Sequence, residues 1–172
     1  MKIERKWAMP NKWTFTIKPI KELLKEELSE GLWVDPFAGE NSPAKIKNDL
    51  NPKIKADHHL QATDFLKMFD DESVDGVLFD TPYSHRQVKE CYESVGIEGW
   101  DGRMNFWSDP KSEIARIIKP GGKVICFGWN SMGIGIGRGF EMTRVLLVPH
   151  GGSKNDTICT VEIKDPTQEK LL

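Results

Sequence analysis

The sequence predicts an α/β fold in which helices flank a mainly parallel β-sheet. Short apolar runs that end in polar turns alternate with segments of helical periodicity along most of the 172 residues. Parallel strands need a crossover, which is usually a helix, so this alternation favours a parallel sheet. The last two apolar runs, 140–148 and 157–163, have no helical segment between them, which predicts an antiparallel pair at the carboxyl-terminal edge of the sheet.

The first predicted helix covers 19–29, because its apolar residues recur on one helical face. These residues are Ile20, Leu23, Leu24 and Leu28. Pro19 suits the first turn of a helix and Gly31 suits the position after its end. The preceding segment, 1–13, is polar and basic and is expected to lie over the surface.

The remaining predicted elements continue the alternation. Strands are expected at 32–34, 44–49, 59–61, 74–80 and 123–128. Helices are expected at 63–69, 84–95 and 108–118. Thr63 is the expected cap of the first of these helices, and Pro120-Gly121-Gly122 is expected to close the last.

The composition indicates one soluble globular domain spanning 1–172. Hydrophobic residues make up 38% of the chain and charged residues 29%. The 24 Lys and Arg residues against 26 Asp and Glu residues leave a net charge of -2, which excludes nucleic-acid binding through bulk positive charge. A local basic face is compatible with that balance.

The cysteines and the amino terminus point to the cytoplasm. Cys91, Cys126 and Cys159 are far apart and form no CxxC pair, which argues against a disulfide framework and against a structural zinc site. Buried, reduced thiols are favoured instead. No apolar stretch follows the charged residues 1–6, so a secretory signal is not expected, and no apolar run is long enough to span a bilayer.

Acidic residues follow three of the predicted strands. Asp35, Asp49 and Asp80 each stand where an apolar run gives way to a turn. A single aspartate at such a place commonly forms a turn. Parallel sheets bind ligands beyond the carboxyl ends of their strands, and three carboxylates gathered there are costly unless they hold something. The set therefore predicts a binding site at this edge.

Four short motifs carry a resemblance to a known family. They are Thr16-Ile17-Lys18-Pro19, Asp35-Pro36-Phe37-Ala38-Gly39, Asp80-Thr81-Pro82-Tyr83 and Pro120-Gly121-Gly122. In these motifs and their order, the sequence resembles the S-adenosylmethionine-dependent amino-methyltransferases of DNA, especially the small adenine methylases of bacteria and their phages. The resemblance covers about 14–164 and implies a class I methyltransferase (Rossmann-like) fold with an antiparallel carboxyl-terminal strand.

The resemblance assigns catalysis to the loop Asp80-Thr81-Pro82-Tyr83. The exocyclic amine of adenine is a poor nucleophile because its lone pair is delocalised into the ring. The Asp80 carboxylate and the carbonyl of Pro82 or its neighbour would accept hydrogen bonds from that amine. The base must leave the duplex to arrive there, and Tyr83 would stack on the flipped ring.

The resemblance also assigns residues to S-adenosylmethionine. Thr16 and Lys18 would help to hold its methionine end. Asp35 would contact the amino-acid end, within the turn that includes Pro36, Phe37 and Gly39. Asp49, with Asn51 in the same turn, would accept from the ribose hydroxyls. Asp64 is a candidate for the adenine amino group, and an equally good interpretation is a charge that interacts with a helix start.

The sequence departs from the family pattern in several places. Thr81 stands where the family has a proline, so the catalytic loop loses some stiffness. The first turn continues Gly39-Glu40-Asn41-Ser42 and lacks a second glycine. Only 13 residues separate Asp35 from Asp49, so the crossover helix must be vestigial or missing. No separate target-recognition domain fits in this length.

Other patterns favour ordinary structure. The alternating glycines of 133–139 do not open a long helix, so a mobile loop is favoured over a phosphate-binding loop. His58 and His59 have no accompanying set of ligands, so no metal is expected. His150 precedes two glycines. A turn is slightly favoured there over a contact with a base or phosphate.

Basic and aromatic residues gather in several segments. The basic ones are Lys2, Arg5, Lys6, Lys12, Arg86, Lys89, Arg138, Arg144 and Lys154. An irregular stretch adds Trp100, Arg103, Phe106 and Trp107. Such residues would suit a strand-separating wedge or a base platform, and a solvated face with ordinary core tryptophans is an equally good interpretation.

We therefore expect a cytoplasmic enzyme that transfers methyl from S-adenosylmethionine to N6 of adenine in double-stranded DNA. The small recognition surface predicts low sequence specificity, a very short site, or help from a second copy or a specificity partner. Two alternatives remain at this point: an RNA adenine methyltransferase, and a degenerate or partner-dependent subunit that binds nucleic acid without catalysis.

Overall fold

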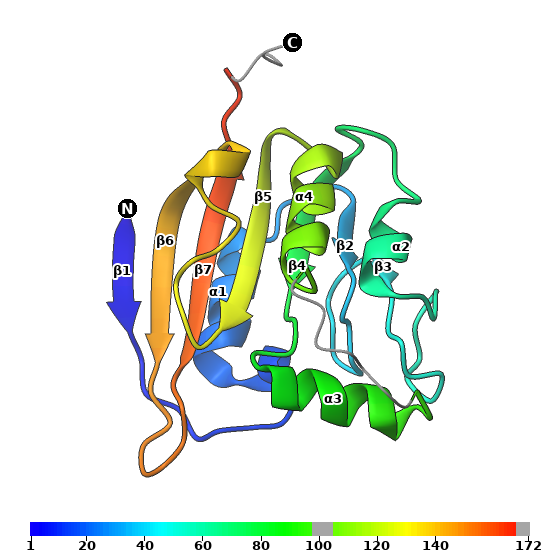
Figure 1. Cartoon of the computed structure of the whole chain (residues 1–172). Coiled ribbons are helices and arrows are strands. Elements are labelled where there is room, and N and C mark those ends of the chain that lie inside the picture. Colours follow the sequence, from blue (N-terminus) through cyan, green and yellow to red (C-terminus); the bar gives the residue numbers. More distant parts are fainter. Residues whose placement is uncertain (98–104, 168–172) are drawn as a thin grey trace.

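The computed structural model describes residues 1–97 and 105–167, which form a seven-stranded sheet with helices on both faces (Figure 1). The strands are β1 (Lys2–Arg5), β2 (Trp33–Asp35), β3 (Ile46–Lys47), β4 (Val74–Phe79), β5 (Ile118–Gly128), β6 (Phe140–Val148) and β7 (Thr157–Lys164). The helices are α1 (Lys18–Glu27), α2 (Ala62–Leu66), α3 (His85–Ser94) and α4 (Ser108–Ile117), with 3-10 turns η1 (Thr14–Thr16) and η2 (Ile136–Arg138).

The sheet is mainly parallel, as predicted. Its order is β1-β6-β7-β5-β4-β2-β3, and β7 alone runs against its neighbours β5 and β6. The antiparallel strand thus lies inside the sheet and not at its edge, which corrects the prediction. The β6–β7 hairpin folds back so that β7 pairs with β5, and β6 is left to pair with β1.

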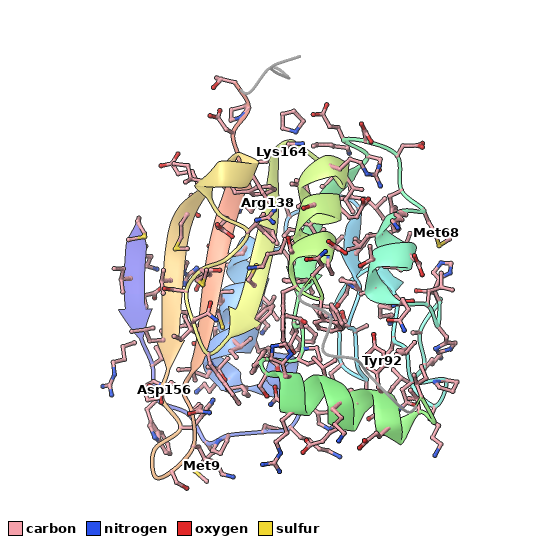
Figure 2. The ribbon with its side chains drawn as sticks, in the orientation of Figure 1. Met9, Met68, Tyr92, Arg138, Asp156 and Lys164 are labelled. Carbon is pink, nitrogen blue, oxygen red and sulfur yellow. The ribbon has the colours of Figure 1, made fainter. Side chains whose placement is uncertain are left out.

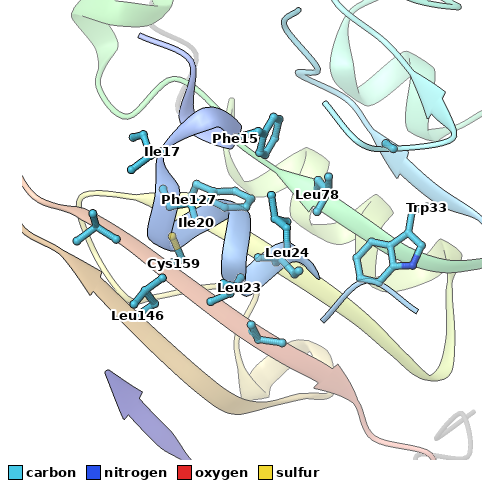
Figure 3. Packing of buried hydrophobic residues seen from close by; sticks show 14 residues of the cluster. Phe15, Ile17, Ile20, Leu23, Leu24, Trp33, Leu78, Phe127, Leu146 and Cys159 are labelled. Carbon is cyan, nitrogen blue, oxygen red and sulfur yellow. The ribbon is translucent and has the colours of Figure 1, made fainter. Parts of the chain in front are cut away.

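Two apolar layers cover the sheet because side chains alternate along the central strands. On β4, Leu78 joins the layer under α1, while Val77 and Phe79 join the layer under α2 and α4. Figure 3 shows the first layer, where Ile20, Leu23 and Leu24 of α1 face Phe127, Leu146 and Cys159 from the strands. The predicted helix at 19–29 is confirmed, with three of its four apolar residues buried and Leu28 packed at the margin.

The amino-terminal segment is more ordered than predicted. Residues 2–5 form β1, which pairs in parallel with 144–147 of β6 at the edge of the sheet. This strand could not be predicted from the sequence because three of its four residues are charged and most are exposed. Its one apolar residue, Ile3, is 63% exposed, so the strand shows no alternation of apolar and polar residues.

Three predicted boundaries differ from the structure. The strand expected at 59–61 is reduced to a single bridge between Asn48 and His58. Thr63 lies inside α2, whose N-cap is Gln61. Pro120-Gly121-Gly122 lies within β5 and not before it, as a bulge in which Gly121 adopts a φ of 77° that favours glycine.

The missing crossover helix is confirmed: 36–45, between β2 and β3, contain only turns. Asn48, with 1% of its surface exposed, takes over the connection. Its side-chain amide donates to the carbonyls of Pro36 (3.0 Å) and Leu60 (2.9 Å) and accepts from the Leu60 N–H (2.9 Å). We call this set of bonds the Asn48 bridge. It ties together the two loops that a helix would otherwise separate.

A cluster of charged side chains lies between β1, β6 and α1, at the opposite edge of the sheet from β3. The Arg144 side chain, 7% exposed, contacts Glu4 of β1 at 2.6 Å and Glu26 and Glu27 of α1 at 2.7 Å and 3.0 Å. Arg144 is therefore unavailable as a basic surface residue. These ion pairs bring β1, β6 and α1 together.

The thiol prediction holds for two cysteines, since Cys126 and Cys159 are buried and free, whereas Cys91 is exposed on α3. Within 1–97 and 105–167, none of the helices has the length and apolar character needed to cross a bilayer.

Candidate active site

A cavity of about 1070 Å³ opens at the carboxyl ends of β2 and β4. Figure 1 shows α3 lying across this end of the sheet, toward which the β5 arrow points. Its walls come from η1, from the turns after β2 and β4, from the segment before α2, and from α3 and the start of α4. This volume is at the upper limit of common ligand sites. It is large enough for a nucleotide-sized ligand and part of a second molecule.

The loop after β4 places a half-buried carboxylate in this cavity. Asp80 accepts a hydrogen bond of 2.5 Å from the Tyr83 hydroxyl. Burial raises the pKa of Asp80, and hydrogen bonds from Tyr83 and Thr14 oppose the shift. Burial and the Asp80 charge also raise the pKa of Tyr83, so its hydroxyl stays protonated as a donor. The Tyr83 ring packs against Trp129, with centroids 5.5 Å apart.

Two side chains hold the backbone of the same loop. The indole N–H of Trp107 donates to the Pro82 carbonyl at 2.9 Å. The amide oxygen of Gln87, in the first turn of α3, accepts from the Tyr83 N–H at 2.6 Å. Ser84 caps α3 by accepting from the Gln87 N–H at 3.3 Å. These bonds fix the Tyr83 N–H relative to α3 and the Pro82 carbonyl relative to the start of α4.

The turn after β2 is built around Asp35, which is fully buried. Its two oxygens accept from the Phe37 N–H at 2.9 Å and from the Ser42 hydroxyl at 2.6 Å. Burial raises the pKa of Asp35 to about 7, and the nearby Asp80 and Asp49 charges add to the shift. Asp35 thus supports the turn from beneath, and Pro36 and Phe37 form the wall above it.

Asp49 joins two turns at the cavity wall. One oxygen accepts from the Gly39 N–H at 2.9 Å and the other from the Asn51 N–H at 2.8 Å. Gly39 has a φ of 54°, a conformation that favours glycine. The carboxylate still lines the cavity, where its remaining lone pairs can accept from a ligand.

The segment before α2 forms the facing wall. Leu60 and Gln61 line the cavity, as does Ala62, the first residue of α2. Gln61 accepts a hydrogen bond of 2.5 Å from the hydroxyl of Tyr92 on α3. Figure 2 labels Tyr92 at the far end of α3. Asp64 also lines the cavity and forms an ion pair of 3.8 Å with Lys67, which agrees with either interpretation of Asp64 in the sequence.

The structure brings together most of the predicted site residues. Those that line the cavity are Pro36, Phe37, Asp49, Asp64, Asp80, Thr81, Pro82 and Tyr83. Those that lie outside its wall are Thr16, Lys18, Asp35, Gly39 and Asn51. Thr16 and Lys18 are exposed, and the Thr16 hydroxyl donates to the Trp13 carbonyl at 2.8 Å. The side chain that η1 directs to the cavity is instead Thr14.

Sequence reasoning missed several cavity residues. They include Thr14, Leu50, Leu60, Gln61, Gln87, Tyr92 and Asp109. Leu50 directly follows Asp49 and belongs to a strand-end segment that the sequence indicates, although no role was assigned to it. Gln87 and Tyr92 carry no such signal, because they reach the cavity only through the placement of α3.

The cavity wall is acidic. Its carboxylates are Asp49, Asp64, Asp80, Glu90 and Asp109, and its one cation among the described residues is Lys67. The two cations of α3, Arg86 and Lys89, pair with Glu90 at 2.7 Å and Glu93 at 3.7 Å. A positively charged ligand suits this wall better than a phosphate does.

Other sequence candidates lie elsewhere. Lys2 and Lys6 pair with Glu4. His150 is buried between the Ala8 carbonyl and the Thr157 hydroxyl. Trp100 and Arg103 fall outside the described residues, within which no group of three or more His, Cys, Asp or Glu residues could hold a metal ion.

Comparison with known proteins identifies the fold. No family model and no curated protein matches the sequence. The structure is similar to TrmN from Thermus thermophilus, with a TM-score of 0.58 and 17% identity over 86% of this chain, which spans about half (49%) of that one. It is also similar to 1,6-didemethyltoxoflavin-N1-methyltransferase from Burkholderia thailandensis, crystallised with S-adenosylhomocysteine (TM-score 0.57, 13% identity, 86% of this chain and 77% of that chain).

A third neighbour is a SAM-dependent methyltransferase from Thermotoga maritima (TM-score 0.54, 16% identity, 84% of this chain and 87% of that chain). At such identities the likeness establishes the fold alone. The chain has the class I, Rossmann-like methyltransferase fold, and its cavity lies at the carboxyl ends of the parallel strands, where such sheets bind ligands.

Proposed function

We propose that this protein transfers a methyl group from S-adenosylmethionine to the N6 amine of adenine in DNA. The observation that carries the proposal is the half-buried Asp80 carboxylate, set in a cavity wall beside the loop carbonyls and Tyr83. The class I fold and the Asp80-Thr81-Pro82-Tyr83 motif support the same chemistry.

The cavity fits the proposed cofactor. When bound, S-adenosylmethionine supplies an electrophilic methyl group on a positively charged sulfur, and the acidic wall complements that charge. Asp49 would accept from the ribose hydroxyls, Phe37 and Leu60 would contact the adenine ring, and Thr14 would lie near the amino-acid end. Asp35 would act indirectly, by fixing the turn that carries Phe37.

The catalytic loop would activate the amine of the substrate. The Asp80 carboxylate would accept a hydrogen bond from one N–H and a backbone carbonyl from the other, which favours the tetrahedral nitrogen that attacks. The Pro82 carbonyl already accepts from Trp107, so the neighbouring Thr81 carbonyl is the better candidate. With its raised pKa, Asp80 could also hold the proton that the amine releases. Tyr83 could stack on the base only after its hydroxyl leaves Asp80.

The test is mass spectrometry of nucleosides after incubation with isotope-labelled S-adenosylmethionine and unmethylated duplex DNA. We expect labelled N6-methyladenine with the wild-type protein and none with Asp80→Ala. Asp57→Ala is the matched control, because it removes a carboxylate outside the cavity whose one described role is to accept from the Lys47 N–H. Calorimetry should detect cofactor binding by both variants. Label found in single-stranded RNA and not in DNA would support the RNA alternative.

A second candidate is transfer to an amine of a small molecule. The acidic wall and the paired cations of α3 favour it, because both weaken the attraction for a duplex. The same labelled assay with free adenosine and small amines distinguishes the two. Label in the free compound with none in DNA would replace the first proposal by the second.

A further inference from the structure

The catalytic loop lacks the first proline of its motif, and the surrounding structure holds it in another way. A proline at 81 would fix one backbone torsion of the loop. Thr81 has no such restraint, although it is 8% exposed and its hydroxyl lies 3.5 Å from the Pro82 carbonyl. That distance is long for a hydrogen bond between oxygens. The stiffness of the loop must come mainly from other contacts.

Two hydrogen bonds supply those contacts from opposite sides. Trp107, just before α4, donates to the Pro82 carbonyl at 2.9 Å. Gln87, on α3, accepts from the Tyr83 N–H at 2.6 Å. The Pro82 carbonyl and the Tyr83 N–H belong to one peptide group, so this single rigid unit is tied to two different helical segments. Neither bond involves an atom that the proposed reaction uses.

Trp107 is itself held in place by its neighbours. Its ring packs edge-to-face against His85, with centroids 4.8 Å apart, and against Phe106 at 5.0 Å. Phe106 in turn contacts Phe37 of the cavity wall at 6.3 Å. The indole therefore joins the catalytic loop to the turn after β2, on which the proposed cofactor site is built.

We propose that Trp107 and Gln87 are positioning residues, which hold the Asp80 carboxylate and the Thr81 carbonyl in the geometry that a proline at 81 would otherwise help to maintain. This inference rests on the proposed function, since it assigns a role within the same reaction. Misplacement of a reacting group by about 1 Å can cost on the order of 100-fold in rate.

The test measures kcat, KM and cofactor affinity for variants that remove one bond each. Trp107→Phe keeps an aromatic ring and removes the N–H donor. Gln87→Met keeps the length of the side chain and removes the acceptor, whereas Gln87→Glu keeps an acceptor oxygen. We expect Trp107→Phe and Gln87→Met to lower kcat by roughly 10- to 100-fold with little change in cofactor Kd. Gln87→Glu should recover most of the lost rate.

Trp33→Phe is the matched control for the indole. It removes an N–H donor to the Ser29 carbonyl (3.2 Å) on the far side of the sheet, where no cavity residue is involved. We expect it to lower the melting temperature and to leave kcat unchanged. If Trp107→Phe and Trp33→Phe lower activity only in parallel with stability, the positioning role is wrong.

Adding Thr81→Pro to the Trp107→Phe variant distinguishes stiffness from any other loss. If Trp107 acts by restraining the loop, the added proline should restore at least part of kcat. If the double variant folds and kcat is not restored, then a proline at 81 does not replace the restraint that Trp107 supplies. Should the double variant fail to fold, the contrast between Gln87→Met and Gln87→Glu still decides the matter.

A readout that needs no activity separates this inference from the proposed function. Amide hydrogen exchange measured by NMR should show the Tyr83 N–H protected in the wild type and in Gln87→Glu, and at least 10-fold less protected in Gln87→Met. If the wild type transfers no methyl group but this pattern appears, the proposed function fails and the restraint on the loop stands. Equal protection in all three proteins would overturn the restraint itself.

Discussion

Buried charge is handled in opposite ways in the two halves of the sheet. In the half formed by β5, β7, β6 and β1, the buried cation Arg144 is neutralised by Glu4, Glu26 and Glu27. In the half formed by β4, β2 and β3, Asp35 and Asp80 accept hydrogen bonds from hydroxyl and backbone groups, and their pKa values are raised. The first arrangement stabilises the fold. The second costs stability, and carboxylates with raised pKa values are found more often at functional sites than elsewhere.

The largest effect should come from Asp80→Ala. We expect kcat to fall by about 1,000-fold, because the variant removes the acceptor that polarises the amine. Stability should be unchanged or higher, since a carboxylate disfavoured by burial is removed. Rate assays test the predicted fall in kcat, and urea denaturation tests the predicted stability. A large loss of stability would remove the contrast between the two halves of the sheet.

Arg144→Met should show the reverse pattern. Removing the cation takes one partner from each of three carboxylates, although Glu4 keeps Lys2 and Glu27 keeps Lys123. The cost in the free energy of unfolding should therefore lie at or below the roughly 3 kcal/mol at the lower end for an uncompensated buried charge. The methyl-transfer rate of the folded fraction should not change, because Arg144 is remote from the cavity wall. Arg116→Met is the control. Its side chain, 31% exposed, also pairs with two carboxylates and donates to the Phe69 and Leu66 carbonyls, and its loss should cost about 1–2 kcal/mol.

Asp35→Asn should change how stability depends on pH. The folded pKa of about 7 lies above the ordinary value of 3.8 that the unfolded chain has, so the wild type loses the stability that this group contributes as the pH rises from 4 to 7. At about 1.4 kcal/mol per pH unit, the loss is on the order of 4 kcal/mol. The variant has no titrating group there. Its amide oxygen can accept from the Phe37 N–H, whereas its NH2 must donate to the Ser42 hydroxyl, which reverses that bond. Urea denaturation at several pH values should show the wild type falling relative to the variant, and parallel curves would contradict the raised pKa.

Asn48→Ala should have the smallest of these effects on the whole molecule. It removes the partner of the buried Pro36 carbonyl and of both backbone groups of the more exposed Leu60, at a cost of about 2 kcal/mol in the free energy of unfolding. Because both loops line the cavity, the Kd for S-adenosylmethionine should also rise. Asn51→Ala is the control. Its amide lies outside the cavity wall and, in the part of the chain that the structure describes, accepts from the exposed Lys53 N–H alone, so neither quantity should change much.

The fold could be predicted from periodicity and turn residues. The helix at 19–29 and the strands at 74–80, 140–148 and 157–163 are confirmed within a few residues. β1 was not predicted because most of its residues are charged and it pairs with a neighbouring strand on one side only. The place of β7 inside the sheet depends on long-range pairing, which no local pattern specifies.

The site was predictable where it follows strand ends and less so elsewhere. Asp49 and Asp80 line the cavity because each follows a strand on the same edge of the sheet. Asp35 shares that position but is covered by its own turn, which short-range spacing cannot reveal. Trp107 and Gln87 meet the catalytic loop only once two helices are packed, so their contacts could not be inferred from sequence.

The Asn48 bridge joins the outer edge of the sheet to the cavity wall, which should make the two open together. The backbone N–H of Asn48 donates to the Asp35 carbonyl at 2.8 Å, while its side chain holds both loops. Local opening of such a unit exposes all its amides together, and a ligand that bridges the two loops suppresses that opening. Slower hydrogen exchange at a single amide of the edge strand would then show what fraction of the protein has ligand bound in the neighbouring cavity.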